Sequence, residues 1–178
     1  KWENLLVISA LAFFLFPLRA WGAGVTINEI MFDPAGKERE WIELYNSGNE
    51  EVYLSGWELY PDGIGYFLFP YGTKIGPGRF LVVHMESSEV PPADSDIYHK
   101  MGSMGNTSGS IAIFSGEPRG KNTIKDFVAW GRKGETWESA AADAGLWTKD
   151  TFIDIASFTE GKTLVRKDSG FGASAWGI

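Results

Sequence analysis

The chain has 178 residues, of which 44% are hydrophobic and 22% are charged, a composition typical of one globular domain and not of a disordered tail. It contains no cysteine, which excludes a disulfide framework, cysteine-ligated zinc or iron–sulfur sites, and a thiol nucleophile. With 16 basic and 23 acidic residues, the formal net charge is −7. This charge argues against nucleic-acid binding, because phosphate contacts need a basic face.

The first 24 residues form a segment of their own. Lys1 precedes an apolar run over 5–18, which is followed by small residues two positions apart. This order is typical of a secretory signal peptide over 1–24. A membrane anchor needs about 20 apolar residues, and Pro17 interrupts the run, so we expect no stable membrane span after cleavage of the leader. The leader predicts a protein that is secreted, held at the cell surface or periplasmic.

From residue 25 onward, short runs of β-branched and aromatic residues are separated by Gly, Pro, Asn and Asp about every ten residues. This pattern predicts an all-β sandwich that begins at residue 25 and has its core in 25–130. Turns such as Asp33–Gly36 supply the fixed φ of proline and the positive φ of glycine that reversals need. The runs predict eight strands, over residues 25–32, 40–46, 51–54, 57–60, 65–69, 80–84, 110–114 and 123–130.

Two segments break this rhythm. Residues 85–104 are rich in Glu, Ser, Pro and Asp, and they are either a disordered insertion or a binding loop. Residues 134–145 predict a short helix on the sandwich, with Thr136 as its N-cap and Gly145 at its end.

Most residues within the predicted strands have a structural interpretation. We expect Trp41, Trp57 and Trp130 in the core, since aromatic residues fill the inner faces of sandwiches, and stacking on a sugar ring or a partner is the alternative for each. Asn46 is expected to bond nearby backbone and to end its strand.

Five phrases that lie between Val25 and Trp130 occur in the order typical of one family: VTINEIMFDP, EWIELYNSGNEEVYLSGWELYPDG, YFLFPYGTKIGPGRFLVV, MGNTSGSIAIFSG and TIKDFVAWG. Together they resemble the lamin tail domain. The closing segment GKTLVRKDSGFGASAW resembles the ending of exported bacterial members, so the helix and tail over 134–176 are expected to complete the same domain. The resemblance implies an immunoglobulin-like β-sandwich that works by interaction and has no shared catalytic residues. Nuclear members contact chromatin, but the acidic charge and the leader speak against nucleic-acid binding here.

Calcium is the one cofactor that the sequence suggests, because hard cations prefer carboxylate and carbonyl oxygens. Two acidic clusters offer such oxygens, and neither follows the twelve-residue calcium loop. Solvated surface acids are therefore the favoured explanation of both. One cluster lies beside a turn and comprises Asp33, Glu38 and Glu40; the other lies in 85–104 and comprises Asp94 and Asp96, with His99 close enough in sequence for a mixed site.

The sequence carries no recognisable catalytic constellation. Glu29 and Glu43 lie among apolar neighbours, so each carboxylate must be paired, hydrogen-bonded or at the surface. Two such groups could serve a small carboxylate glycosidase, which stays an alternative. His84 and His99 match no zinc motif, and the chain has no G-x-S-x-G nucleophile pattern and no phosphate-binding loop.

We therefore expect a protein that is not an enzyme but a non-catalytic interaction or adhesion module of an exported protein. Its expected partner is a protein, a polysaccharide or an envelope component, and not nucleic acid. A further alternative is an N-terminal accessory domain of a longer secreted hydrolase, whose catalytic domain would follow residue 178.

Overall fold

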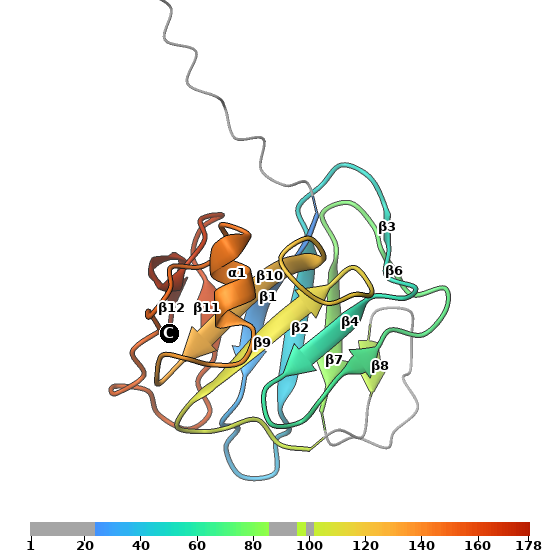
Figure 1. Ribbon diagram of the computed structural model, residues 1–178. Coiled ribbons are helices and arrows are strands. Elements are labelled where there is room, and N and C mark those ends of the chain that lie inside the picture. The colour runs from blue at the N-terminus through green and yellow to red at the C-terminus, as the bar shows by residue number, and fades with distance from the viewer. Residues whose placement is uncertain (1–23, 86–95, 99–101) are drawn as a thin grey trace, which may run out of the picture.

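The computed structural model of the protein describes residues 24–85, 96–98 and 102–178. Two β-sheets pack face to face with the hydrophobic core between them, and one short helix lies outside (Figure 1). The all-β, immunoglobulin-like sandwich predicted from the sequence is confirmed.

The larger sheet has six strands. All neighbours in it are antiparallel except the last pair, which runs parallel. In spatial order the strands are β12 (Trp176–Gly177), β11 (Leu164–Arg166), β1 (Val25–Met31), β2 (Trp41–Asn46), β7 (Phe80–His84) and β8 (Asp96–Tyr98).

The second sheet has four antiparallel strands, in the order β10 (Ile124–Trp130), β9 (Gly109–Phe114), β4 (Glu58–Pro61) and β5 (Phe67–Leu68). A two-stranded ribbon pairs β3 (Val52–Tyr53) with β6 (Lys74–Ile75). Helix α1 (Glu138–Asp143) packs against β10, and a 3₁₀ turn over Ala173–Ala175 precedes β12.

All eight predicted strands are present, and their ends agree with the prediction to within two residues. Strands β6, β8, β11 and β12 were not predicted, because two or three residues are too few to show a period. Strand β8 lies inside the predicted insertion over 85–104, most of which is outside the described residues.

The helix is shorter than the predicted span of 134–145. The prediction of Thr136 as N-cap is wrong, because Trp137 occupies that position with a φ of 71° and no side-chain capping bond. The predicted end is confirmed: Gly145 has a φ of 75°, and its N–H and that of the next residue donate to carbonyls of the last turn, as in a Schellman motif.

The tryptophans divide between core and surface. Trp130 is buried and Trp57 packs at the edge of the core, as predicted. Trp41 lies on the outer face of β2, where it alternates with fully buried Ile42, so its assignment to the core was wrong. Asn46 is buried, and its amide donates to three backbone carbonyls and ends β2, as expected.

Candidate interaction surface

The outer face of the four-stranded sheet is covered on one side only. Helix α1 and the chain around it lie over β10 and β9, where the Trp147 ring meets Phe127 edge-on at 5.3 Å between centroids. Ser110 on β9 donates to the carbonyl of Thr136 in the same covering segment. The side formed by β4 and β5 keeps large side chains in contact with solvent.

Strand β5 shows why these side chains are exposed. The residues of β5 and the one on either side of it alternate in direction. Phe67 and Phe69 are 5% and 2% exposed in the core, while Tyr66 and Leu68 point outward and are 38% and 60% exposed. This segment is apolar on both faces but buries only one of them, and the other face meets solvent.

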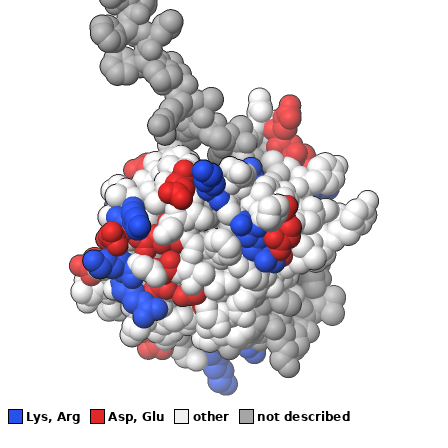
Figure 2. All heavy atoms as spheres, in the orientation of Figure 1, with Lys and Arg blue, Asp and Glu red and all other residues white. Residues whose placement is uncertain are grey.

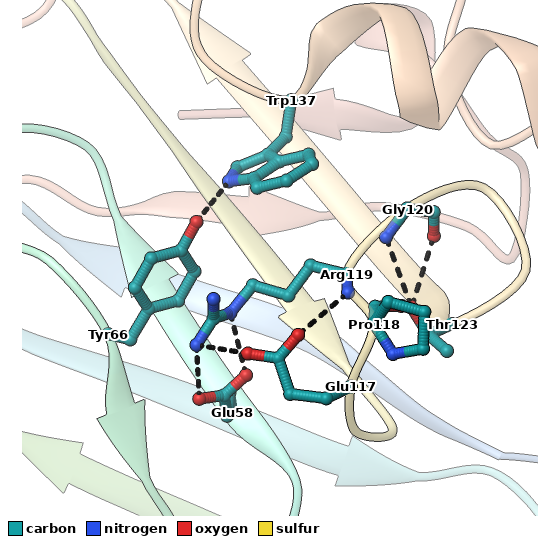
Figure 3. A network of polar contacts seen from close by, with 8 residues as sticks. All are labelled: Glu58, Tyr66, Glu117, Pro118, Arg119, Gly120, Thr123 and Trp137. Atoms are coloured by element: carbon teal, nitrogen blue, oxygen red, sulfur yellow. Dashed lines mark hydrogen bonds and ion pairs between the residues drawn. The ribbon is translucent and has the colours of Figure 1, made fainter.

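Arg119, in the turn between β9 and β10, fixes the position of Tyr66 (Figure 3). Its Nε and Nη2 atoms donate to the two oxygens of Glu58 at 2.8 and 2.7 Å, and Nη2 also contacts Glu117 at 2.7 Å. The hydrogen bond to Glu58 raises the pKa of Arg119 above its ordinary value. The guanidinium lies 3.5 Å from the centroid of the Tyr66 ring, close enough for a cation–π contact.

Trp137 holds the other end of the Tyr66 ring. Its indole N–H donates to the Tyr66 hydroxyl at 3.1 Å, and its ring packs edge-on against Phe114. The Tyr60 ring lies 4.6 Å from that of Tyr66. We call the area formed by Tyr60, Tyr66, Leu68, Arg119 and Trp137 the Tyr66 surface. In Figure 2, which shows this face, charged side chains stand in separate groups with an uncharged area between and below them.

A pair of carboxyl groups adjoins this surface. Tyr60 donates its hydroxyl proton to Asp62 at 3.2 Å, and Arg132 donates to Glu135 at 2.7 Å. Burial, and then the hydrogen bond with Asp62, raise the pKa of Glu135. Burial also acts to raise the pKa of Asp62, but hydrogen bonds from Glu135, Thr136 and Tyr60 outweigh it and lower that pKa.

Of the two groups, Glu135 therefore keeps a proton to higher pH than Asp62 does. Pairs of carboxyl groups whose pKa values are shifted in opposite directions also occur in acid–base catalysis. The Glu135 side chain, however, is only 1% exposed, so it is out of reach of a solvent-borne substrate. The pair has a structural role here, since it ties the segment before α1 to the end of β4.

The two glutamates of the glycosidase alternative lie directly opposite each other on β1 and β2. Glu29 accepts a hydrogen bond from the hydroxyl of Thr163 at 2.6 Å, and Glu43 accepts one from the amide of Asn28 at 2.7 Å. The structure thus brings the two residues together and gives each a neutral donor. Catalysis by them stays a prediction.

The first acidic cluster holds a neighbouring loop. Glu40 is buried and accepts hydrogen bonds from the Ser103 hydroxyl at 2.8 Å and the Met104 N–H at 2.6 Å. Asp33 accepts one from the amide of Asn106, while Glu38 is exposed. Two of the three carboxylates are thus engaged in fixing the approach to β9.

In the second cluster, Asp96 lies on β8 with a carboxylate oxygen 3.4 Å from His84 Nε2, and Asp94 and His99 lie outside the described residues. Within 24–85, 96–98 and 102–178, no three His, Cys, Asp or Glu side chains gather closely enough to hold a metal ion. Calcium binding stays a prediction.

The Tyr66 surface was not predicted from the sequence. One signal was available: residues 66–69 are four consecutive apolar residues in a predicted strand, so one face of a half-buried strand had to expose some of them. The contact between Arg119 and Glu58 had no such signal, because 61 positions separate the two residues.

Among the described helices, none combines the length and apolarity needed to cross a membrane. A family model described as Lamin Tail Domain matches residues 20–159, which include all strands from β1 to β10 and helix α1. A search of the curated proteins found no match.

Proposed function

Since the chain belongs to the lamin tail domain family, whose fold is immunoglobulin-like, we propose that it is a non-catalytic interaction module that binds its partner through the Tyr66 surface. The observation that carries this proposal is the exposure of Tyr66 and Leu68, at 38% and 60%, beside a sheet face that is otherwise covered. Exposed apolar side chains that adjoin one another and have a polar rim are typical of interaction sites.

The rigidity of Tyr66 supports the proposal. Arg119 stacks on its ring and Trp137 hydrogen-bonds its hydroxyl, so the side chain is ordered before any partner arrives. Binding then costs little side-chain entropy. Tyr, Trp and Arg are also the residues that most often carry the binding energy of protein interfaces.

We further propose that the module is exported, and is secreted, held at the cell surface or periplasmic. The support is the order of residues over 1–24, which is that of a signal peptide. The proposed partner is a protein, a polysaccharide or an envelope component. Nucleic acid is not proposed, because the net charge of −7 would repel phosphate groups.

The test is a binding screen of the purified protein against glycans, peptidoglycan and a displayed peptide library, repeated with Tyr66→Ala. We expect at least one class to bind, and Tyr66→Ala to weaken that binding roughly tenfold or more. The control is Phe80→Ala, which removes an aromatic ring that is 48% exposed on the other sheet. Binding that survives Tyr66→Ala but is lost in Phe80→Ala would place the site elsewhere, and turnover of esters or glycosides that survives purification would contradict a non-catalytic role.

A further inference from the structure

The backbone of β5 offers hydrogen-bonding groups at an edge of the four-stranded sheet. The N–H of Phe69 donates to the carbonyl of Trp57 at 3.0 Å, so the odd-numbered residues of this segment bond toward β4. Successive residues of a strand direct their backbone groups to opposite sides. The N–H and C=O of Leu68 therefore point away from β4, and no other strand of the described chain pairs with β5 there.

The pairing of β4 with β9, on the other side of β4, indicates the same alternation of backbone directions. The N–H of Asp62 donates to the carbonyl of Ser110, so even-numbered residues of that segment bond toward β9 and odd-numbered ones toward β5. Leu59 and Phe67 then form the pair that joins β4 to β5. The direction of the open edge of β5 thus follows from both pairings of β4.

The edge of β5 is shielded only by the shortness of the strand and by Pro70 directly after Phe69. Natural sheets also shield an open edge with lysines or inward-pointing charges, and this segment has neither. Tyr66 to Phe69 are all uncharged and apolar, and Leu68, in the middle of the edge, is 60% exposed. A further aromatic side chain, Tyr71, is 99% exposed just beyond the end of the strand.

We infer that the open edge of β5 receives an extended, basic segment of a partner protein as a fifth strand of this sheet. This inference rests on the proposed function and specifies the kind of partner that the Tyr66 surface would bind. Backbone hydrogen bonds to Leu68 would supply affinity, and alternate side chains of the segment would contact Tyr66 and Leu68. A sugar could stack on the rings but would leave the backbone groups of this edge without strand partners.

The charge of the site favours a basic segment over a second copy of the chain. Glu58 and Glu117 share the single guanidinium of Arg119, and Glu117 remains 59% exposed, so these three side chains together carry one net negative charge, with Lys121 as the exposed cation of the same turn. A second copy would bring the same rim and a net charge of −7 to the contact. Lysine or arginine side chains on the incoming strand would be attracted instead.

The experiment uses the whole chain and a fluorescent ten-residue peptide of alternating Lys and Val, titrated by fluorescence anisotropy. Two matched peptides are compared with it: one has Glu in place of Lys, and the other carries N-methyl groups on alternate backbone nitrogens and keeps its charge. We expect binding of the Lys–Val peptide, no binding of the Glu peptide, and a loss of roughly tenfold or more on N-methylation.

The protein variant is Leu68→Pro, which removes the N–H that points away from β4 and is tolerated at an edge strand. It should weaken peptide binding roughly tenfold or more, whereas Phe80→Ala should leave it unchanged. If Leu68→Pro fails to fold, Leu68→Lys takes its place. This variant keeps the backbone intact and repels a basic strand, so it should weaken peptide binding to the same extent. Hydrogen exchange at the amide of Leu68 should slow when the peptide is added.

Equal binding by the N-methylated peptide, or by Leu68→Pro and Leu68→Lys, would overturn strand addition. The proposed function would still stand in that case if Tyr66→Ala abolished binding, and both would fail if Tyr66→Ala had no effect. A dimer in analytical ultracentrifugation that Leu68→Pro dissociates would also overturn the inference, because the edge would then belong to a second copy.

Discussion

Asp126 on β10 and Arg166 on β11 form a buried ion pair that joins the two sheets of the sandwich. Between them lies Ile27 on β1, next to a shift in the register with β2. The N–H of Ile27 donates to Asp126 at 2.8 Å, and its carbonyl accepts from Arg166 Nε at 2.8 Å. The pair thus satisfies the backbone N–H and C=O of Ile27, which lies outside the stretch of β1 that pairs with β11.

The first prediction concerns this pair. Burial raises the pKa of Asp126, and the charge of Arg166 opposes that rise. Arg166→Met keeps much of the side-chain volume but leaves a buried carboxylate without its cation. We expect the free energy of unfolding at neutral pH to fall by about 3–5 kcal/mol, measured by denaturant titration.

The pH dependence of this variant follows from the same shift. Without Arg166 the folded-state pKa of Asp126 lies still further above its unfolded value, so stability falls as pH rises between the two. The loss of stability caused by Arg166→Met should therefore be smaller in acid than at neutral pH. The control is Lys74→Met, which breaks an exposed pair with Glu51 and should cost less than about 1 kcal/mol. An equally small effect of Arg166→Met would contradict the prediction.

The second prediction concerns Glu135. Because burial and Asp62 raise its pKa, the folded state keeps a proton that the unfolded state has lost, and stability falls as pH rises above the unfolded value of about 4.3. Glu135→Gln replaces the protonated carboxyl with an amide that can still donate to Asp62 and accept from Arg132. We expect a higher Tm near pH 7, by about 3 °C for each kcal/mol gained, and a weaker dependence of Tm on pH.

The control for this change is Glu117→Gln, since Glu117 is 59% exposed and outside the Asp62 pair. Its Tm should follow that of the wild type across the pH range. A Tm profile of Glu135→Gln that runs parallel to the wild type would show that Glu135 ionises normally in the folded protein.

Local patterns were enough to predict the sandwich. In β2, the alternation of Ile42 and Leu44 with polar and aromatic neighbours identifies the buried face, and the structure buries both residues fully. Gly145 predicts the end of α1 because only glycine readily adopts the required positive φ. Each of these features depends on residues within one element.

The features that could not be predicted from the sequence depend on pairs of residues from different elements. Arg119 could have bonded any of many carboxylates, and only the fold brings Glu58 to it across 61 positions. Asp126 and Arg166 are separated by 40 positions, and no periodicity marks them as partners. Trp41 was assigned to the core because its size favours burial, but its register on β2 faces it outward.

The third prediction tests the role of Arg119 in holding the hairpin turn against β4. Arg119→Met leaves the largely buried Glu58 without its two charge-assisted hydrogen bonds, which should cost about 1–3 kcal/mol. Amide exchange in the turn over 115–123 should become faster. Arg119→Lys should recover only part of the loss, because an ammonium cannot make the paired bonds. The exposed neighbour Lys121 gives the control, and an effect of Lys121→Met equal to that of Arg119→Met would argue against a specific clamp.

The fourth prediction concerns Gly109, the first residue of β9. A Cβ atom at this position would lie 2.6 Å from Cζ2 of the buried Trp130, which is closer than carbon atoms approach. Gly109→Ala must therefore displace the indole ring or the strand, and we expect a loss of about 1–3 kcal/mol in the free energy of unfolding. Gly120→Ala is the matched control, because a Cβ there has nothing within 4 Å. Equal stability of the two variants would mean that Trp130 has room to move, and near-ultraviolet circular dichroism of the indole would show whether it has done so.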